Sequence, residues 1–335
     1  MIKILFAASK YDYANPELGL SNEYYFFYDT FLHLKNVKVE LFDWVLLSKK
    51  FGRDKMNDLL YQKVKKEKYD LVFFSIFEEE FKKEVIKSLS IDLKTQTFNI
   101  FANDDWQFDT YSRFWAPQFS FIATDVEEVI KRYKAIGYKN VVRVHWGINP
   151  RFWKNFNLAK TIDVSFVGQA YGNRKGIING IKRSGVSIQA FGRGFDGGKL
   201  STERMITIFN RSKVNLNISE HSRKLKYAKF LPAVFQPTTI DTKAFQMKAR
   251  VFEVPGSGGF LLTTYGEPLK DYFRLGKEIE TYKDFDELIQ KVKFYLENDS
   301  LREKIARAGY IRTSENYTYE QRVIKMFGEI GLKIN

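Results

Sequence analysis

The feature that most constrains the fold of this chain is an alternation of short apolar runs with amphipathic stretches. The apolar runs predict strands buried on both faces, at 3–8, 37–44, 69–77, 97–102, 119–124 and 141–146. Between them, patterns with helical spacing stand at 21–34, 54–68, 79–89 and 125–137. Strands that alternate with helices form a parallel sheet with helices on both faces. The first half of the chain therefore predicts an α/β fold.

The alternation is interrupted once and then restarts. The segment 147–161, which contains Gly147 and Pro150, breaks the pattern and reads as a linker. After it, strands are expected at 161–168, 186–192, 213–219, 258–264 and 278–282, with helices at 174–184, 201–211 and 242–254. A chain of 335 residues is long enough for two cores. We predict two doubly wound, Rossmann-like domains, residues 1–150 and 151–316, and a C-terminal helix in 317–335 that packs back on the first domain.

Composition excludes several classes of protein. A hydrophobic content of 44% with 28% charged residues is typical of a globular protein and not of a disordered one. No uncharged apolar run is long enough to span a membrane. The absence of cysteine excludes disulfides and thiolate metal sites, and the three histidines are far apart in sequence. We therefore expect a cytoplasmic protein without a metal site or a bound cofactor.

Positive charge is concentrated in one segment of the chain. The formal net charge is +14, and residues 151–250 account for all of it, with 19 Lys and Arg against 5 Asp and Glu. A concentrated positive field suits a polyanionic ligand such as a nucleotide diphosphate, a nucleic acid or an anionic membrane surface. A solvated lysine-rich face is the other interpretation, and the composition leaves both open.

Two glycine-bearing loops follow predicted strands of the second domain, where ligands of doubly wound sheets bind. In VGQAYGNRKG, a strand ends at Gly168 and a helix opens with Arg174 and Lys175. A helix N-terminus with adjacent cations holds phosphate well, although an ordinary exposed turn has the same composition. The loop FGRGFDGG, residues 191–198, formally matches G-x-G-x-x-G, but no helix opens at its third glycine. We interpret it as a glycine-rich surface loop.

Acidic residues follow one predicted strand of the first domain. In FANDDWQFDTY, Asn103, Asp104 and Asp105 come directly after the strand at 97–102. Adjacent carboxylates at a strand end serve as a general base or bind hydroxyl groups, and they are equally common as helix caps. The 31 Phe and 19 Tyr raise a third interpretation, a stacking surface for nucleic acid, for which the basic and aromatic segment 221–235 is the best fit.

The stretch RVFEVPGSGGFLLTTYGE, residues 250–267, begins a segment that resembles a known family. From 250 to 323 the chain carries an R-x-F-E-x-x-x-x-G stretch, an apolar strand, a G-x-E segment and a helix pair. This segment resembles the C-terminal module of group 1 glycosyltransferases, and it is most similar to the CgeB-like, spore-maturation-protein-type branch. The resemblance implies a GT-B fold, in which two Rossmann-like domains face a central cleft. The second domain would bind the donor and the first the acceptor.

The resemblance also implies roles for single residues. Glu253 falls on the family's glutamate that pairs with the nucleotide ribose, and Pro255 is expected to stop its helix. Phe245 stands where the family has a first glutamate, which contacts the donor sugar. The donor site would further contain Gly168, Arg174, Lys175, Thr242, Lys243 and Ala244, with the two cations at the diphosphate. The catalytic candidates are Asp105 and then Asp104, for contact with the acceptor hydroxyl, and Arg174, for the leaving group.

The function implied is transfer of a hexosyl group from a UDP- or GDP-linked sugar to a hydroxyl of a glycan, lipid or other polymer. The resemblance implies a metal-independent reaction with retention of configuration. The protein would be cytoplasmic, with peripheral contact to the inner face of the membrane or to a polyanionic acceptor. Two alternatives stay open from the charge pattern. One is a non-catalytic basic module that binds nucleic acid or anionic membrane, and the other is a glycosyltransferase that acts on nucleic acid.

Overall fold

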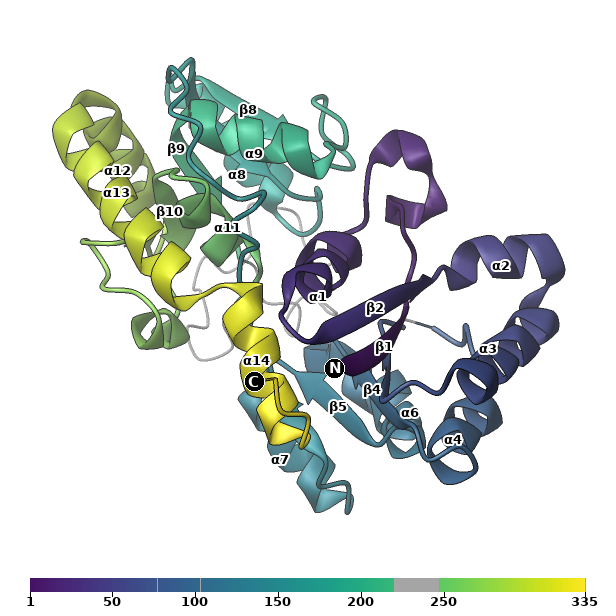
Figure 1. Cartoon of the computed structure of the whole chain (residues 1–335). Helices are drawn as coiled ribbons and strands as arrows, with labels where there is room; N and C mark the ends of the chain where they lie inside the picture. The colour runs from purple at the N-terminus through teal and green to yellow at the C-terminus, as the bar shows by residue number, and fades with distance from the viewer. Residues whose placement is uncertain (77, 103, 220–246, 335) are drawn as a thin grey trace. The chain divides into compact units, whose positions relative to one another are not determined.

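The computed structural model describes residues 1–334 apart from 77, 103 and 220–246, and it divides the chain into two compact units (Figure 1). Unit 1 contains Met1–His145 and the chain from Tyr319 onward, and unit 2 is Trp146–Thr318. The chain therefore leaves unit 1 once and returns to it with its last helix. The changes of unit lie close to the limits of the predicted ranges 1–150, 151–316 and 317–335.

Unit 1 is built on a parallel six-stranded sheet with the order β2-β1-β3-β4-β5-β6. The strands are β1 Ile2–Ala7, β2 Val37–Phe42, β3 Leu71–Phe74, β4 Gln96–Ile100, β5 Phe121–Thr124 and β6 Val141–Arg143. In the centre of the sheet Ile4 pairs with Leu71, and every residue of β3 is buried. Apolar residues on both faces of a strand indicate a sheet covered on both sides. Each strand falls within one of the predicted apolar runs, or within a residue of it.

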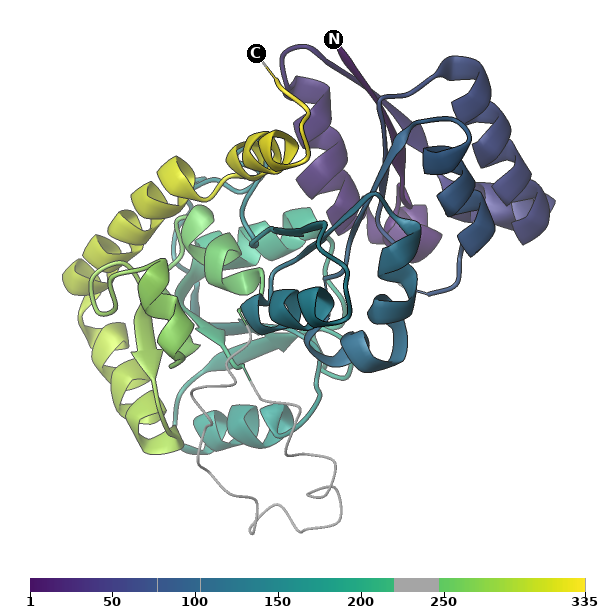
Figure 2. The same cartoon turned by 90° about the horizontal axis from the view of Figure 1, so that it is seen from below.

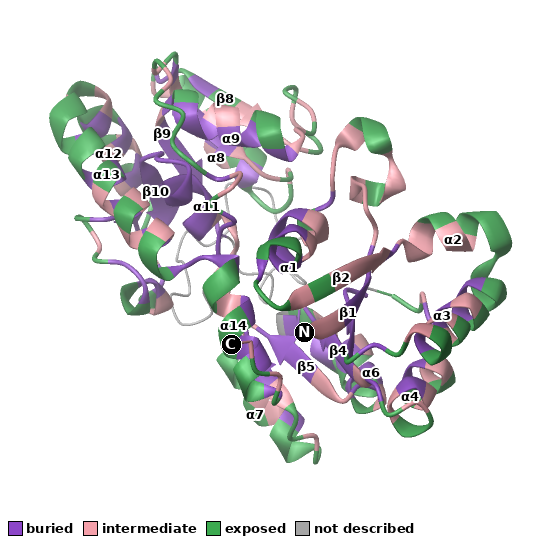
Figure 3. Ribbon diagram, in the orientation of Figure 1, coloured by how far each residue is buried: buried purple, intermediate pink, exposed green. Residues whose placement is uncertain are grey.

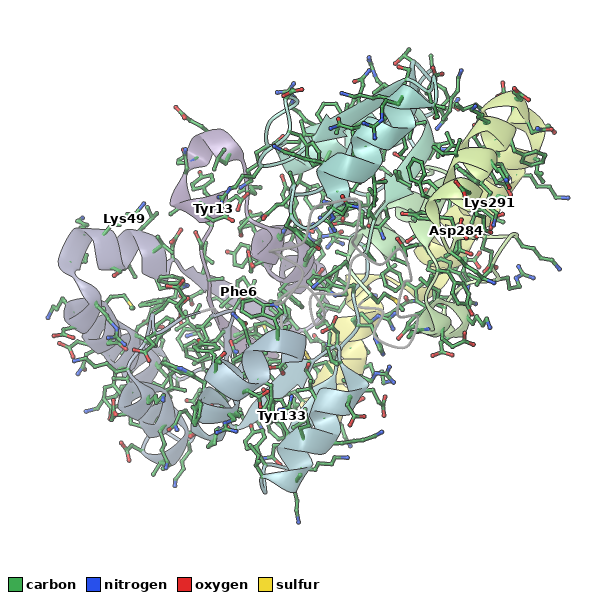
Figure 4. The ribbon with its side chains drawn as sticks, turned by 180° about the vertical axis from the view of Figure 1, so that it is seen from behind. Phe6, Tyr13, Lys49, Tyr133, Asp284 and Lys291 are labelled. Atoms are coloured by element: carbon green, nitrogen blue, oxygen red, sulfur yellow. The ribbon has the colours of Figure 1, made fainter. Side chains whose placement is uncertain are left out.

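Helices connect these strands and cover the sheet. Their bounds are η3 Tyr24–Tyr28, α1 Asp29–His33, α2 Trp44–Phe51, α3 Arg53–Glu67, α4 Lys83–Ile91, α5 Asp104–Gln107, η4 Phe108–Ser112, α6 Arg113–Trp115 and α7 Glu127–Ala135. Helix α2 was not predicted. It begins where the Asp43 side chain accepts a hydrogen bond from the Leu46 N–H, 3.1 Å away, which is a standard helix cap. In Figure 4, Phe6 lies inside this unit and Lys49 on its outer side.

The last helix, α14 Tyr319–Glu329, belongs to unit 1, although the segment that precedes it in sequence belongs to unit 2. The Tyr319 ring stacks on Phe26 with a centroid separation of 4.5 Å, and the Phe327 ring stacks on Phe31 at 5.7 Å. All four rings are buried. The aromatic residues of the N-terminal segment therefore pack against a helix from the other end of the chain.

Unit 2 has a parallel five-stranded sheet with the order β11-β10-β9-β7-β8. Its strands are β7 Ile162–Val167, β8 Ile188–Phe191, β9 Ser212–Asn217, β10 Leu261–Thr264 and β11 Glu280–Tyr282. Its helices are α8 Arg174–Arg183, α9 Thr202–Arg211, α11 Arg250–Gly256, η8 Glu267–Asp271, α12 Phe285–Glu297 and α13 Asp299–Asn316. Figure 3 shows β9, β10 and α11 as buried, while α12 and α13 expose one side. These two helices lie side by side in both views (Figures 1 and 2).

Two local features of unit 2 mark the ends of helices. Asp284 caps α12, because its side chain accepts a hydrogen bond from the Glu287 N–H at 2.9 Å. The prediction that Pro255 stops its helix was wrong, since α11 continues to Gly256 and holds Pro255 in its last turn. The chain turns at Gly258, whose φ of 77° and close approach to Asn155 both require glycine.

Candidate functional site

The carboxyl end of β7 is closed by a contact between two glycines. Gly168 follows β7 directly, and its N–H donates to the Phe191 carbonyl at 2.9 Å, which joins the ends of β7 and β8. A Cβ atom on Gly168 would come within 2.9 Å of the Phe166 ring and 3.3 Å of the Arg174 guanidinium. Gly192, with φ of 123°, would place a Cβ directly on the Gly168 carbonyl. Gly192 therefore has to be glycine, and a Cβ at Gly168 would have to displace the Phe166 ring or the Arg174 guanidinium.

Arg174 is buried beneath this loop, at the first position of α8. One terminal nitrogen donates to the Gln169 carbonyl at 3.0 Å. The other donates to the Ile218 carbonyl at 2.6 Å and to the Tyr171 hydroxyl at 2.8 Å, while the Tyr171 ring lies 3.8 Å from the guanidinium carbon. The guanidinium therefore ties the loop after β7 to the chain that leaves β9.

An ion pair between a buried glutamate and a partly exposed arginine is fixed to the same strand end. Glu253 is 2% exposed and pairs with Arg250, one turn earlier on α11. The Arg250 Nε also donates to the Val167 carbonyl at 3.2 Å, so the pair is fixed to the last residue of β7. Burial raises the pKa of the Glu253 carboxyl, and the Arg250 charge opposes that rise. The structure thus brings Gly168, Arg174 and Glu253 to one strand end, together with Arg250.

Hydroxyl and amide groups hold the neighbouring strand ends together. The Asn217 amide donates to the Thr263 hydroxyl at 2.9 Å, across the ends of β9 and β10. The Thr264 hydroxyl bonds the Tyr282 hydroxyl at 3.0 Å and accepts from the Ser219 N–H at 3.1 Å. All five residues are buried. Such satisfied polar groups make the carboxyl edge of this sheet rigid.

Lys175, also predicted for the donor site, is exposed, and it lines a separate hollow of about 400 Å³ with residues of α8 and of the loop after β8. Thr242, Lys243, Ala244 and Phe245 lie outside the described residues. The spacing of Arg174 and Lys175 in sequence therefore does not place their charges together, because adjacent residues of a helix point in different directions.

Asp104, predicted to contact the acceptor, has a different environment from the one expected. Its side chain is fully buried, and it accepts hydrogen bonds from the Ser112 hydroxyl and from the Tyr133 hydroxyl, the latter at 2.9 Å. The carboxylate therefore joins α5 to η4 and α7. An acceptor hydroxyl would have to displace these partners to reach the carboxylate, and contact of Asp104 with the acceptor stays a prediction. The Asp105 side chain lies outside the described structure.

Sequence reasoning missed Arg250 and Tyr171. The signal for Arg250 was present, since the R-x-x-E spacing of Arg250 and Glu253 puts both on one helix face. No comparable signal pointed to Tyr171. Its hydroxyl meets Arg174 only through the turn of the loop.

Two kinds of feature are absent from the described part of the chain. No three acidic or histidine side chains there are grouped as a metal site would need. None of the helices in that part is both long and apolar enough to cross a membrane.

A protein-family model described as glycosyl transferase-like matches residues 160–328, about half of the chain. The chain belongs to the glycosyl transferase-like family. The matched segment begins before β7 and contains Gly168, Arg174, Arg250 and Glu253. The enzyme class predicted from the sequence, a glycosyltransferase, is confirmed.

Solved structures show the fold of the whole chain. The structure of HepE from Anabaena, in complex with UDP and glucose, matches this chain with a TM-score of 0.63 at 11% sequence identity. The match covers 99% of this chain and 100% of the HepE chain. A glycosyltransferase from Rickettsia africae has a TM-score of 0.59 at 11% identity, with 98% of each chain covered. Sucrose-phosphate synthase from Thermosynechococcus elongatus has a TM-score of 0.57 at 9% identity, with 99% of this chain and 98% of its own covered. The predicted GT-B fold is confirmed. Among curated proteins, none matches the chain by sequence.

Proposed function

We propose that this glycosyltransferase transfers a hexosyl group from a UDP-linked sugar to a hydroxyl acceptor, with a GDP-linked donor as the alternative. The observation that carries the proposal is the group at the carboxyl end of β7, where Gly168, Arg174 and the Arg250–Glu253 pair meet. Ligands of doubly wound sheets bind at such strand ends. The structurally similar HepE was solved with UDP-glucose, which supports a uridine nucleotide.

Glu253 is proposed to accept hydrogen bonds from the nucleotide ribose. Its carboxylate is held in place by Arg250, so it needs no reorganisation when a hydroxyl arrives. Arg174 is proposed to position the loop that carries Gly168, since its guanidinium donates to the loop itself. Lys175 stays a proposed diphosphate contact from the family resemblance, although its side chain lines the separate hollow beside β8. Thr242, Lys243 and Ala244 stay proposed diphosphate contacts from the family resemblance.

The acceptor side of the proposal rests on unit 1. Asp105 stays the proposed contact of the acceptor hydroxyl, with Asp104 as the buried residue that anchors its helix. Metal-independent transfer with retention of configuration, membership of the CgeB-like branch, and a cytoplasmic location with peripheral contact to the inner face of the membrane also belong to the proposal. They derive from the family resemblance and from a chain without cysteine.

Isothermal titration with UDP, UDP-glucose and GDP tests the donor site. Glu253→Gln should weaken UDP binding at least about tenfold, which is about 1.4 kcal/mol, because a neutral amide pairs less well with two hydroxyls. Glu297→Gln, an exposed position on α12, should bind like the wild type. The proposal fails if no nucleotide binds, or if the two variants cannot be distinguished.

The alternative function is a basic module for nucleic acid. Its best-fitting segment, 221–235, lies outside the described residues. Affinity for DNA or RNA that falls steeply with salt, without any affinity for nucleotides, would favour this alternative over the glycosyltransferase donor site.

A further inference from the structure

Four cations surround the edge strand of the unit 2 sheet. Strand β8 lies at the end of the strand order and pairs only with β7 among the described strands. Helix α8 precedes β8 and α9 follows it, and right-handed crossovers place these helices on opposite faces of the sheet (Figure 1). Lys175 and Lys182 lie on α8, and Arg204 and Arg211 lie on α9. We call these four residues the β8 edge cations.

Each helix spaces its two cations in the same way. Lys175 and Lys182 are seven residues apart, as are Arg204 and Arg211. Seven residues make about two helical turns, or roughly 10 Å, so both cations of a pair lie on the same side of their helix. All four side chains line hollows beside β8, the lysines on one side and the arginines on the other. The strand therefore runs between two rows of positive charge.

These charges are not neutralised within the described part of the chain. None of the β8 edge cations forms an ion pair there, although each is exposed. Asp196 is the one carboxylate that lines either hollow. Glu203 precedes Arg204 on α9, but its side chain lines neither of the two hollows. Exposed cations of one sign at fixed spacing produce a positive field that attracts an extended polyanion.

The hollows contain groups that suit sugar rings. The α8 side has a volume of about 400 Å³ and includes Asn179 and Phe195. The α9 side has a volume of about 390 Å³ and includes Thr207 and Phe191. Gln189, exposed in the middle of β8, borders both. Amides and hydroxyls bond the hydroxyl groups of a sugar, and aromatic rings pack against its apolar faces.

Two other kinds of polyanion fit this surface less well. An acidic peptide that adds a strand to the open edge of β8 would meet Gly197, whose Cβ would be only 2.6 Å from the Ala190 carbonyl. The loop thus covers the carboxyl end of that edge. An anionic bilayer is bound most strongly by basic surfaces that also insert large apolar side chains. None of the residues that line the two hollows is an exposed large hydrophobic.

We propose that the β8 edge cations bind an anionic glycan, a sugar polymer that carries carboxylate, phosphate or sulfate groups. The lysine and arginine rows contact its charged groups, and the amides and rings between them contact its sugars. This inference goes beyond the proposed function, because it assigns a polymer-binding surface to unit 2, whereas the acceptor hydroxyl is proposed to contact unit 1.

The test is fluorescence anisotropy of the full chain with labelled oligogalacturonate, a carboxylated sugar polymer. The wild type should bind it, and Lys182→Gln/Arg204→Gln should weaken binding at least about tenfold, because one cation of each row is lost. Lys293→Gln/Lys304→Gln removes the same charge from exposed positions on α12 and α13 and should stay within about twofold of the wild type. Circular dichroism of both double variants checks that they fold.

Competitor polymers decide the chemical class. Neutral dextran should not displace the probe, and a sulfated oligosaccharide should. The inference is overturned if both double variants lose affinity equally, since net charge alone would then act. It is also overturned if poly-glutamate, duplex DNA or phosphatidylglycerol vesicles bind the wild type more tightly than oligogalacturonate does, and bind Lys182→Gln/Arg204→Gln more weakly than the wild type. UDP binding of the wild type, measured separately, shows whether the proposed function itself fails.

Discussion

The Arg250–Glu253 pair shows how a charge is kept in the interior of unit 2. Glu253 is almost fully buried, and its side chain would be costly to ionise without a cation. Arg250 lies one turn away on the same helix and is anchored to the Val167 carbonyl. The glutamate can therefore stay a directed hydrogen-bond acceptor at the end of β7. Its role in the proposed donor site depends on this neighbour.

Removal of Arg250 should therefore cost stability as well as nucleotide affinity. We expect Arg250→Ala to lower the free energy of unfolding by about 3–5 kcal/mol, since it leaves a buried carboxylate uncompensated. Arg250→Met/Glu253→Gln should cost less than Arg250→Ala alone, because no charge is then left unpaired. Urea denaturation measures both. If the double variant is the less stable of the two, Arg250 does not compensate the buried charge of Glu253.

His145 should make unit 1 sensitive to acid. Burial, with the charges of Arg143, Arg322 and Lys325, lowers the pKa of His145 from 6.5 to about 3. The unfolded chain therefore takes up a proton near pH 6.5 that the folded chain does not. This contribution to stability is complete above pH 6.5 and is lost as the pH falls toward 3. As the pH falls over this range, the urea midpoint should decrease less steeply in His145→Gln than in the wild type. Parallel pH profiles of the two proteins would contradict the lowered pKa of His145.

At the scale of elements, loops of unit 2 are shaped by glycines in close contact. Gly168 and Gly192 bring the chain after β7 against the chain after β8, and Arg174 fastens the first of these loops to the end of β9. The loop conformation therefore depends on contacts between three strand ends. A single added methyl group at Gly192 would overlap the Gly168 carbonyl.

Gly192→Ala should destabilise the protein and weaken UDP binding together. Its φ of 123° and the adjacent Gly168 carbonyl both exclude a Cβ, so we expect a loss of at least about 2 kcal/mol. Gly328→Ala is the matched control. This position is inside α14, has no atom within 4 Å of an added Cβ, and should gain about 0.5–1 kcal/mol. Thermal unfolding of both variants checks the opposite signs.

Helix α14 should be essential to the stability of unit 1. Phe327 is fully buried against Phe31, so Phe327→Ala should cost about 3–5 kcal/mol. Phe294 on α12 is 47% exposed, and Phe294→Ala should cost less than about 1 kcal/mol. Denaturant unfolding compares the two. Similar losses would mean that α14 contributes little to the core.

At the scale of the whole molecule, the two units have separate hydrophobic cores. One contains Phe42, Met56 and Leu60, and the other contains Val164 and Leu262. The proposed nucleotide contacts belong to unit 2 alone. Ligand binding therefore stabilises primarily the unit that holds the site, by about 2.7 kcal/mol at a hundredfold excess over Kd.

Hydrogen exchange should locate this effect. With saturating UDP, amides in the loop after β7, the first turn of α8 and α11 should exchange more slowly. Amides of α3 and α4 in unit 1 should be unaffected by UDP. Protection confined to unit 1 would move the donor site away from β7.

The alternation of apolar and amphipathic segments was sufficient to predict both sheets and most helices. The spacing of apolar residues is a local property of the sequence. A parallel strand that is buried on both faces is a short continuous apolar run, a pattern that few other elements show. Helix α2 was missed, since the predicted strand 37–44 includes its first residue, Trp44, and no helix was predicted over the rest of it. At the candidate site, sequence resemblance indicated Gly168, Arg174 and Glu253, which the structure places around one strand end.

The fold class, the family and the segment that carries the excess positive charge could be predicted from the sequence, since each is a property of local composition or of a contiguous motif. The directions of the charged side chains could be read only from the three-dimensional structure. It buried Arg174 under its own loop, paired Glu253 with Arg250 and enclosed Asp104 between Ser112 and Tyr133. These outcomes depend on neighbours far away in sequence or on the opposite face of a helix. Long-range packing fixes such contacts, and residue spacing does not.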